Sequence, residues 1–502
     1  MSLPPIHVYN TLTRSVDLLE TAEPGHVRMY VCGMTVYDFC HIGHARAMMA
    51  FDVVYRHLVH RGYRVSYVRN HTDVDDKILA RAAELGVAPL DLSAQYIEAL
   101  EQDLDALGLA RPDHEPKVSD HVDGIVSLIG DLVDRGHAYA GSGDVFFAVG
   151  TFDGYGKLSG RKLEDLRAGE RVQVNPDKRD PADFVLWKGA KDGEIAWPSP
   201  WGPGRPGWHI ECSVMSMHHL GPTFDVHGGG IDLVFPHHEN EIAQSEAGTG
   251  AAPFSRIWMH NGHLTLVDDD GADIKMSKSL GNVVRIRDVL AQVPAEVLRL
   301  VYLESHYRSP LPYSNGRMAE AMASLARLYE AKELVETLAV SEIDYPPEKL
   351  AQEVGKPALQ LMALIGSFEG RFNAAMDHDF NSGQAIGTLF ELVRAINRAG
   401  NHKRVKKLGG ALMAPAELCF AMAGDVLGIG GSDPAAFFEE LRDKRLQLAG
   451  LDSAWVQERL DARLAARASK DWAAADQIRD ELDGAGVVVM DRAEGVTWRV
   501  RV

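Results

Sequence analysis

Two short motifs in this chain carry side chains suited to phosphate chemistry. His41-Ile42-Gly43-His44 would put two imidazoles on one face of a helix, at i and i+3. Backbone N–H groups at a helix start also favour bound phosphate, and Gly43 would let a flat group approach closely. Far downstream, Lys275 and Lys278 lie in KMSKS, where two ammonium groups could neutralise charge that grows during displacement at phosphorus. Alone, each motif could be solvated surface; together they favour a nucleotide site.

A third group consists of side chains that bind zinc, namely Cys32, Cys212, His237 and Glu241. Thiolate, imidazole and carboxylate are an acceptable zinc donor set. If FPHHENEIAQSEA is a helix, His237 and Glu241 project from one face because they are four residues apart. Since Cys32 and Cys212 are far apart in the chain, their spacing alone favours two cysteines packed in a core.

The elements around these residues form a predicted parallel βαβ unit. Alternating apolar residues over His26–Tyr37 predict a strand that enters a loop, and apolar residues at helical spacing predict a helix ending near Gly62. A β-branched run begins again at Arg64. Ligands of such sheets bind at the carboxyl ends of the strands. We therefore expect one site there, containing Cys32, His41, His44, Thr72 and Asp73.

The residue composition and the apolar pattern change twice along the rest of the chain. From about residue 121 to 205, short β-like pieces alternate with Gly, Pro and charge, which predicts an insertion before the chain returns near Trp208. Within it, Trp197–Gly207 (WPSPWGPGRPG) should hold no regular element, because each proline removes a backbone donor. Met318–Leu427 reads as helical, and Pro434–Val502 as helices followed by a hairpin.

Composition excludes several classes of protein. The 502 residues include 52 Lys and Arg against 71 Asp and Glu, a net charge of -19 that argues against a generally basic nucleic-acid coat. Four cysteines cannot form a disulfide framework, so we expect a reducing cytoplasm. The most apolar stretch, Ala411–Gly431, is interrupted by Pro415, Glu417 and Asp425, so we expect no membrane span.

The paired motifs resemble the two signatures of the class I aminoacyl-tRNA synthetases. Four longer strings are similar to the cysteinyl-tRNA synthetases, namely CGMTVYDFCHIGHAR, YVRNHTDVDDKI, GWHIECSVMSM and FDVHGGGIDLVFPHHENEIAQSEA. The likeness runs from NTLTRS near the start to KDWAAADQIRDELDGAGV near the end, so it covers nearly the whole chain.

This resemblance implies an α/β fold, a Rossmann-like parallel-sheet catalytic domain with an insertion, followed by a helical bundle and a small C-terminal α/β module. The implied segments are 1–120 and 206–262 as the two halves of the catalytic domain, the second with the zinc site, 121–205 as an inserted connective domain, 263–317 as the lysine-motif loop and stem-contact region, 318–432 as a helical tRNA-binding bundle, and 433–502 as an anticodon-binding module.

The resemblance also implies roles for residues. Cys32, Cys212, His237 and Glu241 would bind one Zn²⁺, and His41, His44, Lys275 and Lys278 would bind ATP with Mg²⁺ and act in catalysis. The cysteine pocket would contain Thr72, Trp208, His227 and Asp232. A metal suits this substrate because a shape-complementary pocket separates cysteine from serine poorly, whereas zinc prefers a soft thiolate to a hydroxyl.

The implied partners are tRNA(Cys), ATP and L-cysteine, and the family suggests a monomer without a membrane. Contacts to tRNA would come from Lys403 and Arg404 in a basic cluster, although a solvated helix end explains that cluster nearly as well. Trp498 and Arg499 in the last hairpin could stack on and contact unpaired bases.

Two departures from the family pattern concern loops. VDDDGADIKMSKS is longer and more acidic than usual before the lysine motif, and Met34 stands where the family commonly has proline. Three other functions remain open at this point: a ligase that joins cysteine to an amino-sugar, a non-catalytic zinc-dependent RNA-binding protein, and a plain nucleotidyltransferase. The long region after Arg317 argues against the first, and the retained histidines and lysines argue against the second.

Overall fold

The computed structural model describes residues 3–162, 176–267, 273–274, 276, 281–339, 343, 345–492 and 495–500. Lys275 and Lys278 lie outside the described residues, as do Asp268, Asp269 and Asp270 of the acidic loop. The chain divides into two compact units. The first comprises Met1–Thr265, Ser305–Pro312 and Asn373–Ser382, and the second comprises Leu266–Glu304, Tyr313–Phe372 and Gly383–Val502.

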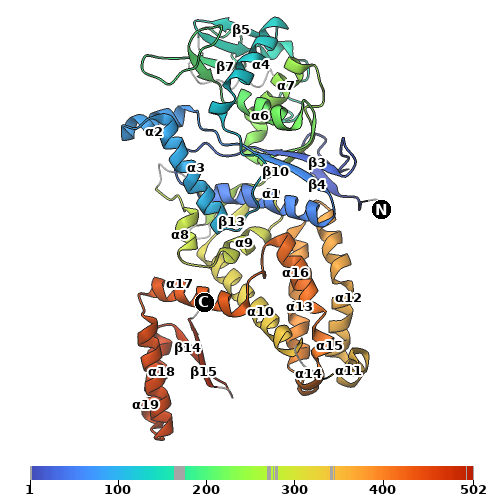
Figure 1. Ribbon diagram of the computed structural model, residues 1–502, viewed down its shortest axis with the longest axis vertical. Coiled ribbons are helices and arrows are strands. Elements are labelled where there is room, and N and C mark those ends of the chain that lie inside the picture. The colour runs from blue at the N-terminus through green and yellow to red at the C-terminus, as the bar shows by residue number, and fades with distance from the viewer. Residues whose placement is uncertain are drawn as a thin grey trace. The chain divides into compact units, whose positions relative to one another are not determined.

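A four-stranded parallel sheet forms the centre of the first unit, in the order β10-β9-β3-β4 (Figure 1). Its strands are β3 (His26–Val31), β4 (Arg64–Arg69), β9 (Phe224–Gly230) and β10 (Ser255–Asn261). Helix α1 (Ile42–His60) connects β3 to β4, so the predicted βαβ unit is confirmed. Helix α1 packs closely on β9, one of the two inner strands, since a Cβ on Gly228 would lie 2.3 Å from the Phe51 ring.

Helix α1 is held in place by a buried cation. The Arg46 guanidinium donates hydrogen bonds to the carbonyls of Gly262 and Ser309, at 3.3 and 2.8 Å. A buried Arg is tolerated only where its donors find partners. Arg46 thus joins the start of α1 to two later segments of the same unit.

The predicted insertion contains α4 (Val122–Asp134) and an antiparallel sheet of β5 (Ala138–Gly141), β6 (Asp144–Phe147), β7 (Phe184–Gly189) and β8 (Gly204–Pro206). The expectation that Trp197–Gly207 holds no regular element is wrong, because β8 pairs with β7. Proline is compatible with this position because β8 is the last strand of its sheet, and the isolated bridge on its other side joins Trp197 to Gly204 rather than to a proline. One hydrophobic core includes insertion residues such as Phe147 and central-sheet residues such as Tyr30 and Trp258.

The first unit also contains the hairpin of β1 (His7–Asn10) and β2 (Ser15–Leu18), and helices α2 (Asp76–Leu85), α3 (Pro89–Ala106), α6 (Ile210–Leu220) and α7 (Glu239–Thr249). Helix α6 packs against β3, β4, α4 and α7. Its first turn carries one predicted metal ligand, and its last turn carries two histidines.

The second unit is mainly helical, which confirms the prediction for Met318–Leu427. The short strands β11 (Leu264–Val267) and β13 (Leu311–Tyr313) each begin in the first unit and end in the second, and β12 (Asp273–Ile274) lies in the second. The helices are α8 (Ile286–Leu290), α9 (Ala295–Leu303), α10 (Asn315–Ala339), α11 (Pro347–Val354), α12 (Lys356–Asp377), α13 (Ser382–Gly400), α14 (Lys403–Leu408), α15 (Gly410–Met413) and α16 (Ala416–Leu427).

The last part of the chain has a small core of its own. Helices α17 (Pro434–Ala449), α18 (Ser453–Ala468) and α19 (Trp472–Gly484) precede the hairpin of β14 (Val487–Arg492) and β15 (Gly495–Val500). Leu446, Val456, Leu460, Leu482 and Val487 are buried together there. The predicted order of helices followed by a hairpin is confirmed.

By length and composition, one helical stretch among the described residues, Gly410–Leu427, is apolar enough to cross a membrane. Half of this stretch is buried inside the protein, and a core helix passes the same test. It is therefore weak evidence for a span.

Candidate active site and metal centre

The four predicted metal ligands, far apart in the sequence, meet in one cluster, in which Cys32 is half-buried and the other three are buried. Cys32 follows β3, Cys212 lies in α6, His237 lies in the turn before α7, and Glu241 lies in α7. One ligand atom from each lies within 4.8 Å of the others. The Cys32 Sγ is 3.6 Å from both the Cys212 Sγ and the Glu241 Oε1, and the His237 Nε2 is 3.1 Å from the same oxygen. We call these four residues the buried cluster.

The buried cluster offers ligand atoms to a cation, and its carboxylate has no lysine or arginine partner among the described residues. Glu241 is fully buried, and among the described residues its ion-pair partners are all histidines. Burial raises the pKa of both thiols, Cys32 and Cys212, and lowers the pKa of His237 well below its ordinary range. A buried carboxylate is normally paired or bound to a metal. The donor set therefore fits a divalent ion.

A second set of possible ligands overlaps the first, because Cys32 and Glu241 also lie near His227 and His238. The His227 Nε2 donates to the Glu241 Oε2 at 2.8 Å, and the His238 Nε2 lies 3.3 Å from the Cys32 Sγ. The set with two thiols suits zinc better. His227 and His238 then have the geometry of partners that orient metal ligands.

Sequence reasoning missed the chain of contacts behind Cys32. His238 Nδ1 lies 2.8 Å from His260 Nε2, and His260 Nδ1 lies 2.7 Å from Thr11 Oγ1. Burial lowers the pKa of His260 to about 3. The only signal in the sequence is that His238 follows His237 directly, and residue order does not reveal which of two neighbouring histidines faces a thiol.

His237 is oriented from its other side. Its Nδ1 lies 3.0 Å from the Nδ1 of His209, so its Nε2 is the nitrogen that faces Glu241. The Trp208 ring stacks on the His237 ring at 4.5 Å and 23°. His209 was not predicted, although it directly follows the predicted Trp208.

His41 takes a different position from the one expected for a helix residue. It is the N-cap of α1, and its Nδ1 accepts hydrogen bonds from the backbone N–H groups of Gly43 and His44, at 3.1 and 3.3 Å. These two N–H groups are therefore satisfied within the helix, and phosphate binding at this helix start stays a prediction. The His41 and His44 rings stack at 3.6 Å and 18°, so the two imidazoles do lie together.

The predicted pocket residue Thr72 belongs to a buried polar network. Its hydroxyl donates to Glu211 Oε2 at 3.1 Å and accepts from the Asn70 amide at 3.3 Å. Asn70 also accepts from the Gly33 N–H at 2.8 Å, and a Cβ on Gly33 would lie 1.7 Å from the Asn70 carbonyl oxygen. The close approach requires glycine at position 33. Neither Asn70 nor Glu211 was predicted.

Glu211 is the fully buried neighbour of Cys212. Burial raises its pKa well above the ordinary range, and its Oε1 has no hydrogen-bond partner among the described residues. Asp232, by contrast, is exposed in the turn after β9. Of the four predicted pocket residues, Thr72 and His227 are buried, and Trp208 is 40% exposed.

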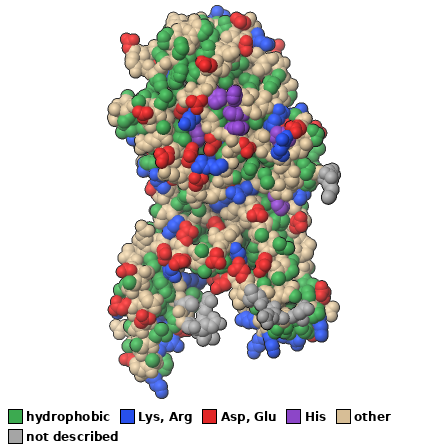
Figure 2. All heavy atoms as spheres, in the orientation of Figure 1, with side chains coloured by type: hydrophobic (Ala, Val, Ile, Leu, Met, Phe, Trp, Pro, Cys, Tyr) green, Lys and Arg blue, Asp and Glu red, His purple; other side chains and the backbone are tan. Residues whose placement is uncertain are grey.

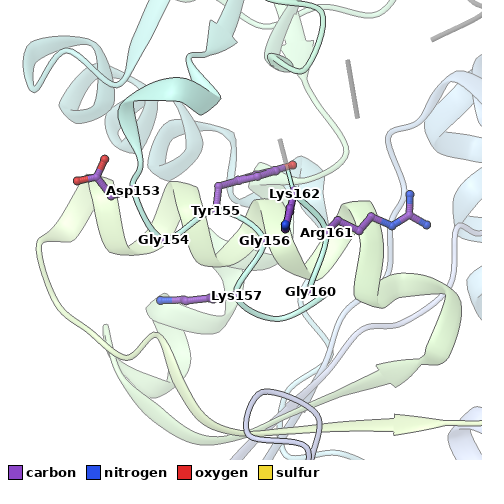
Figure 3. Close-up of a pocket in the computed structure, with 8 residues that line it drawn as sticks. All are labelled: Asp153, Gly154, Tyr155, Gly156, Lys157, Gly160, Arg161 and Lys162. Carbon is purple, nitrogen blue, oxygen red and sulfur yellow. The ribbon is translucent and has the colours of Figure 1, made fainter. Parts of the chain in front are cut away.

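A glycine-rich loop of the insertion, shown in Figure 3, supports α7, the helix that carries Glu241. The backbone N–H groups of Gly156 and Ser159 donate to the two oxygens of Glu239, at 2.9 and 2.7 Å. The Tyr155 hydroxyl donates to Asn240 Oδ1. Residues 153–157 and 160–162 of this segment also line a cavity of about 480 Å³. The insertion thus positions the first turn of α7.

The predicted tRNA contacts all lie in the second unit. Lys403 and Arg404 are exposed at the start of α14, and Arg404 pairs with Glu353 at 2.7 Å. Trp498 in β15 packs against the C-terminal core, with the Arg442 guanidinium 5.4 Å from its ring. Arg499 is exposed, 3.4 Å from Glu330.

Family models match three parts of the chain. A model described as tRNA synthetases class I (C) catalytic domain matches residues 18–323. A DALR domain matches residues 371–429, and a cysteinyl-tRNA ligase anticodon binding domain matches residues 453–499. The first model covers more than half of the chain.

Curated relatives match over nearly their full length. The chain is 48% identical to a cysteine–tRNA ligase of Pelobacter propionicus, over 99% of this chain and 100% of that one. It is 49% identical to one of Methylococcus capsulatus and 50% identical to one of Thioalkalivibrio sulfidiphilus, each over 98% of this chain and 99% of the relative.

Solved structures of other class I enzymes have a similar fold. Mycobacterium tuberculosis methionyl-tRNA synthetase in complex with methionyl-adenylate matches with a TM-score of 0.60 at 15% identity, covering 86% of this chain and 94% of that one. The ternary complex of Agrobacterium radiobacter K84 agnB2 LeuRS matches with a TM-score of 0.57 at 12% identity, covering 84% and 86%. Both likenesses concern the fold alone, and with the family model they confirm the predicted fold class.

Proposed function

The chain belongs to the class I cysteine–tRNA ligases, and on that basis we propose that a zinc ion in the buried cluster reads the thiol of the substrate. The observation that carries this proposal is the fully buried Glu241 beside two thiols and an imidazole, without a lysine or arginine partner among the described residues.

The proposed reaction has two steps. A carboxylate oxygen of cysteine attacks the α-phosphorus of ATP, the bond to the bridging oxygen breaks, and pyrophosphate leaves. A hydroxyl of the terminal ribose of tRNA(Cys) then attacks the carbonyl carbon, and AMP leaves. Because the substrate supplies the nucleophile in both steps, the enzyme needs no nucleophilic side chain. Its residues bind, orient and neutralise charge.

Cys32, Cys212, His237 and Glu241 would hold the zinc ion. When bound, the ion supplies a preference for a soft thiolate over a hydroxyl, which shape alone gives poorly. His227 would keep Glu241 in place through its 2.8 Å hydrogen bond, and His209 would fix the ring of His237. Thr72, Trp208 and Asp232 are proposed to line the remainder of the cysteine pocket.

ATP would be bound, with Mg²⁺, by His41, His44, Lys275 and Lys278. The hydrogen bonds from Gly43 and His44 to the His41 Nδ1 require that nitrogen to be unprotonated, so a neutral ring carries its proton on Nε2. That N–H is a donor suited to a phosphate oxygen. The lysines would add charge where negative charge grows at phosphorus.

The second unit would bind the tRNA, in agreement with the matched anticodon binding domain. Arg499 and Lys403 are exposed cations for phosphates or base edges, and Trp498 offers a partly exposed ring. This module distinguishes the proposal from a ligase that would use the same catalytic half to join cysteine to an amino-sugar. Cytoplasmic location and a monomeric state stay predictions.

The test compares Cys212→Ser with Cys419→Ser, a matched change at a buried cysteine in α16. We expect Cys212→Ser to lose zinc, to retain ATP binding, and to lose cysteine-dependent exchange of pyrophosphate into ATP, because a protonated hydroxyl is a poor zinc ligand. Cys419→Ser should keep its zinc and its activity. A Cys212→Ser enzyme without zinc that still prefers cysteine to serine as strongly as the parent would refute the role of the metal.

Charging of tRNA(Cys) measured on the same samples separates the rival activity. Exchange together with charging supports the ligase reaction. Exchange without charging would instead favour transfer of cysteine to a small amine.

A further inference from the structure

A second group of histidines lies at the other end of α6, away from the buried cluster. His218 and His219 are in the last turn of α6, and His121 directly precedes α4. One ring nitrogen of each lies within 4.8 Å of the others. Histidine side chains gather at the surface over α6 in Figure 2. We call His121, His218 and His219 the surface cluster.

His121 presents one nitrogen in a fixed orientation. Its Nδ1 donates a hydrogen bond to the carbonyl of Lys117 at 2.9 Å. In the neutral ring this leaves Nε2 as a lone-pair donor for a metal. Metal-binding histidines in proteins commonly have such a carbonyl partner on the other nitrogen.

The ring of His219 is packed against a neighbouring ring, and one of its nitrogens is buried. The ring of His114 stacks on it at 4.4 Å and 21°, and its Nε2 is buried without a hydrogen-bond partner among the described residues. A buried ring nitrogen without a partner normally needs an explanation, such as an ion or water.

The geometry and the field of the helix also suit a cation. A tetrahedral zinc ion with bonds of about 2.0–2.1 Å places its nitrogen ligands about 3.4 Å apart. The exposed His218 can rotate to close the present separation. The end of α6 also bears the negative pole of the helix dipole, which favours positive charge near the last turn.

We propose that His121, His218 and His219 form a second metal site that binds a divalent transition ion, Zn²⁺ by preference, with water in the fourth position. Imidazole nitrogen is a ligand that such ions prefer over Mg²⁺ or Ca²⁺. The site is separate from the buried cluster, because Cys212 and His219 are seven residues apart in one helix, about 10 Å along its axis. A bound ion would tie the end of α6 to the start of α4, where the insertion begins.

The first experiment counts metal on the full chain without an affinity tag. After equilibrium dialysis against buffered free Zn²⁺, zinc is measured by mass spectrometry for the parent, His218→Ala and the control His137→Ala, which removes an imidazole that contacts neither cluster. We expect two ions per chain in the parent and in the control, and one in His218→Ala. An ion count in His218→Ala equal to that of the parent would overturn the proposal.

The second experiment assigns each ion to its site and separates this proposal from that for the buried cluster. Cobalt bound by thiolates absorbs strongly in the near ultraviolet through charge transfer, whereas cobalt bound by imidazoles and water shows only weak visible bands. We expect Cys212→Ser to lose the ultraviolet band and keep one ion, and His218→Ala to keep the band unchanged. If His218→Ala lost the band, the surface cluster would not be an independent site. If Cys212→Ser retained the band, the buried-cluster proposal alone would fail.

The two sites also differ in their expected effect on the reaction. Exchange of pyrophosphate into ATP should be equal in His218→Ala and the parent, because the surface cluster touches none of the proposed substrate residues. Added Zn²⁺ should raise the melting temperature of the parent more than that of His218→Ala, as expected for an ion that binds the folded state. An equal rise in both would contradict the link between α6 and α4.

Discussion

The two clusters at the ends of α6 use the same kind of side chain in opposite surroundings. In the buried cluster and behind it, His237, His238 and His260 are almost fully enclosed and have polar partners that hold each ring. In the surface cluster, His218 is exposed and His121 and His219 are half-buried. Burial changes what an imidazole contributes, because an enclosed ring must be satisfied by its neighbours, whereas an exposed ring can be satisfied by water.

This difference separates the expected roles of the clusters. A metal in the buried cluster would replace missing counter-charge and take part in substrate choice. A metal in the surface cluster would add a tie between two helices that already pack against each other. The first should be needed for activity, and the second should be dispensable.

The largest effect is expected for a change at a residue that is not a member of either cluster. Lys278→Ala should lower cysteine-dependent pyrophosphate exchange by roughly 10²–10³-fold, the scale for removing one preorganised charge donor from a transition state. Zinc content and cysteine affinity should stay at parental values, because the lysine contributes to neither. A normal rate of adenylate formation with weakened cysteine binding would show that the roles are wrongly divided.

The effect of burial can be measured on a histidine outside both clusters. Burial lowers the pKa of His71 to about 4. Between that value and the ordinary pKa of about 6.5, the unfolded chain binds the proton more readily, so this group makes stability rise with pH across the window. Protonation of His71 should therefore lower the unfolding free energy by about 3 kcal/mol between the top and the bottom of this window.

The matching measurement is urea unfolding of the parent and His71→Leu at several pH values from 4 to 7. We expect the difference in unfolding free energy between them to change across this window and to be constant above it. A difference that does not vary with pH would mean that burial does not keep His71 neutral.

His238→Ala should affect the buried cluster without removing a proposed ligand. The change takes away the contact with Cys32 and leaves His260 Nε2 unsatisfied. Zinc affinity should fall by about 10–100-fold, and the unfolding free energy by about 1–3 kcal/mol. Chelator competition and urea unfolding measure the two effects. His218→Ala is the matched control at the surface, with an expected change within about 0.5 kcal/mol in the absence of added metal.

The smallest effect is expected for His114, which stacks on His219 from outside the surface cluster. An aromatic pair contributes about 0.5–1.5 kcal/mol, so His114→Ala should lower the zinc affinity of the surface cluster by at most about tenfold. His114→Phe preserves a ring for stacking and should restore most of the affinity. Equal losses in both variants would indicate that His114 binds the metal directly.

Much of the fold follows from local patterns. The βαβ unit was predicted from three patterns: alternation over His26–Val31, helical spacing up to His60, and a β-branched run from Arg64. Such patterns are informative because their period reflects which face of an element is buried. The prediction was wrong at Gly204–Pro206, where local breakers suggested no element. Whether a strand with proline can pair depends on its being at the edge of a sheet, and that is a property of the tertiary structure.

The candidate site also has features that the sequence predicts and features that depend on the tertiary structure. Motifs in the sequence are enough to suggest the chemistry, because His41, Lys278 and the proposed zinc ligands were chosen by residue type, and the resemblance to a family rests on strings of residues. Spacing could not bring Cys32 and Cys212 together, since the meeting of distant segments depends on the packing of a whole core. In the sequence, His237 is adjacent to His238, although the two rings have different neighbours in the fold. His121 is far in the sequence from His218 and His219, although the three rings lie together in the fold. Only the folded chain decides which ring faces a thiol, which faces solvent and which nitrogen is free, because burial and hydrogen-bond partners give identical side chains different chemistry.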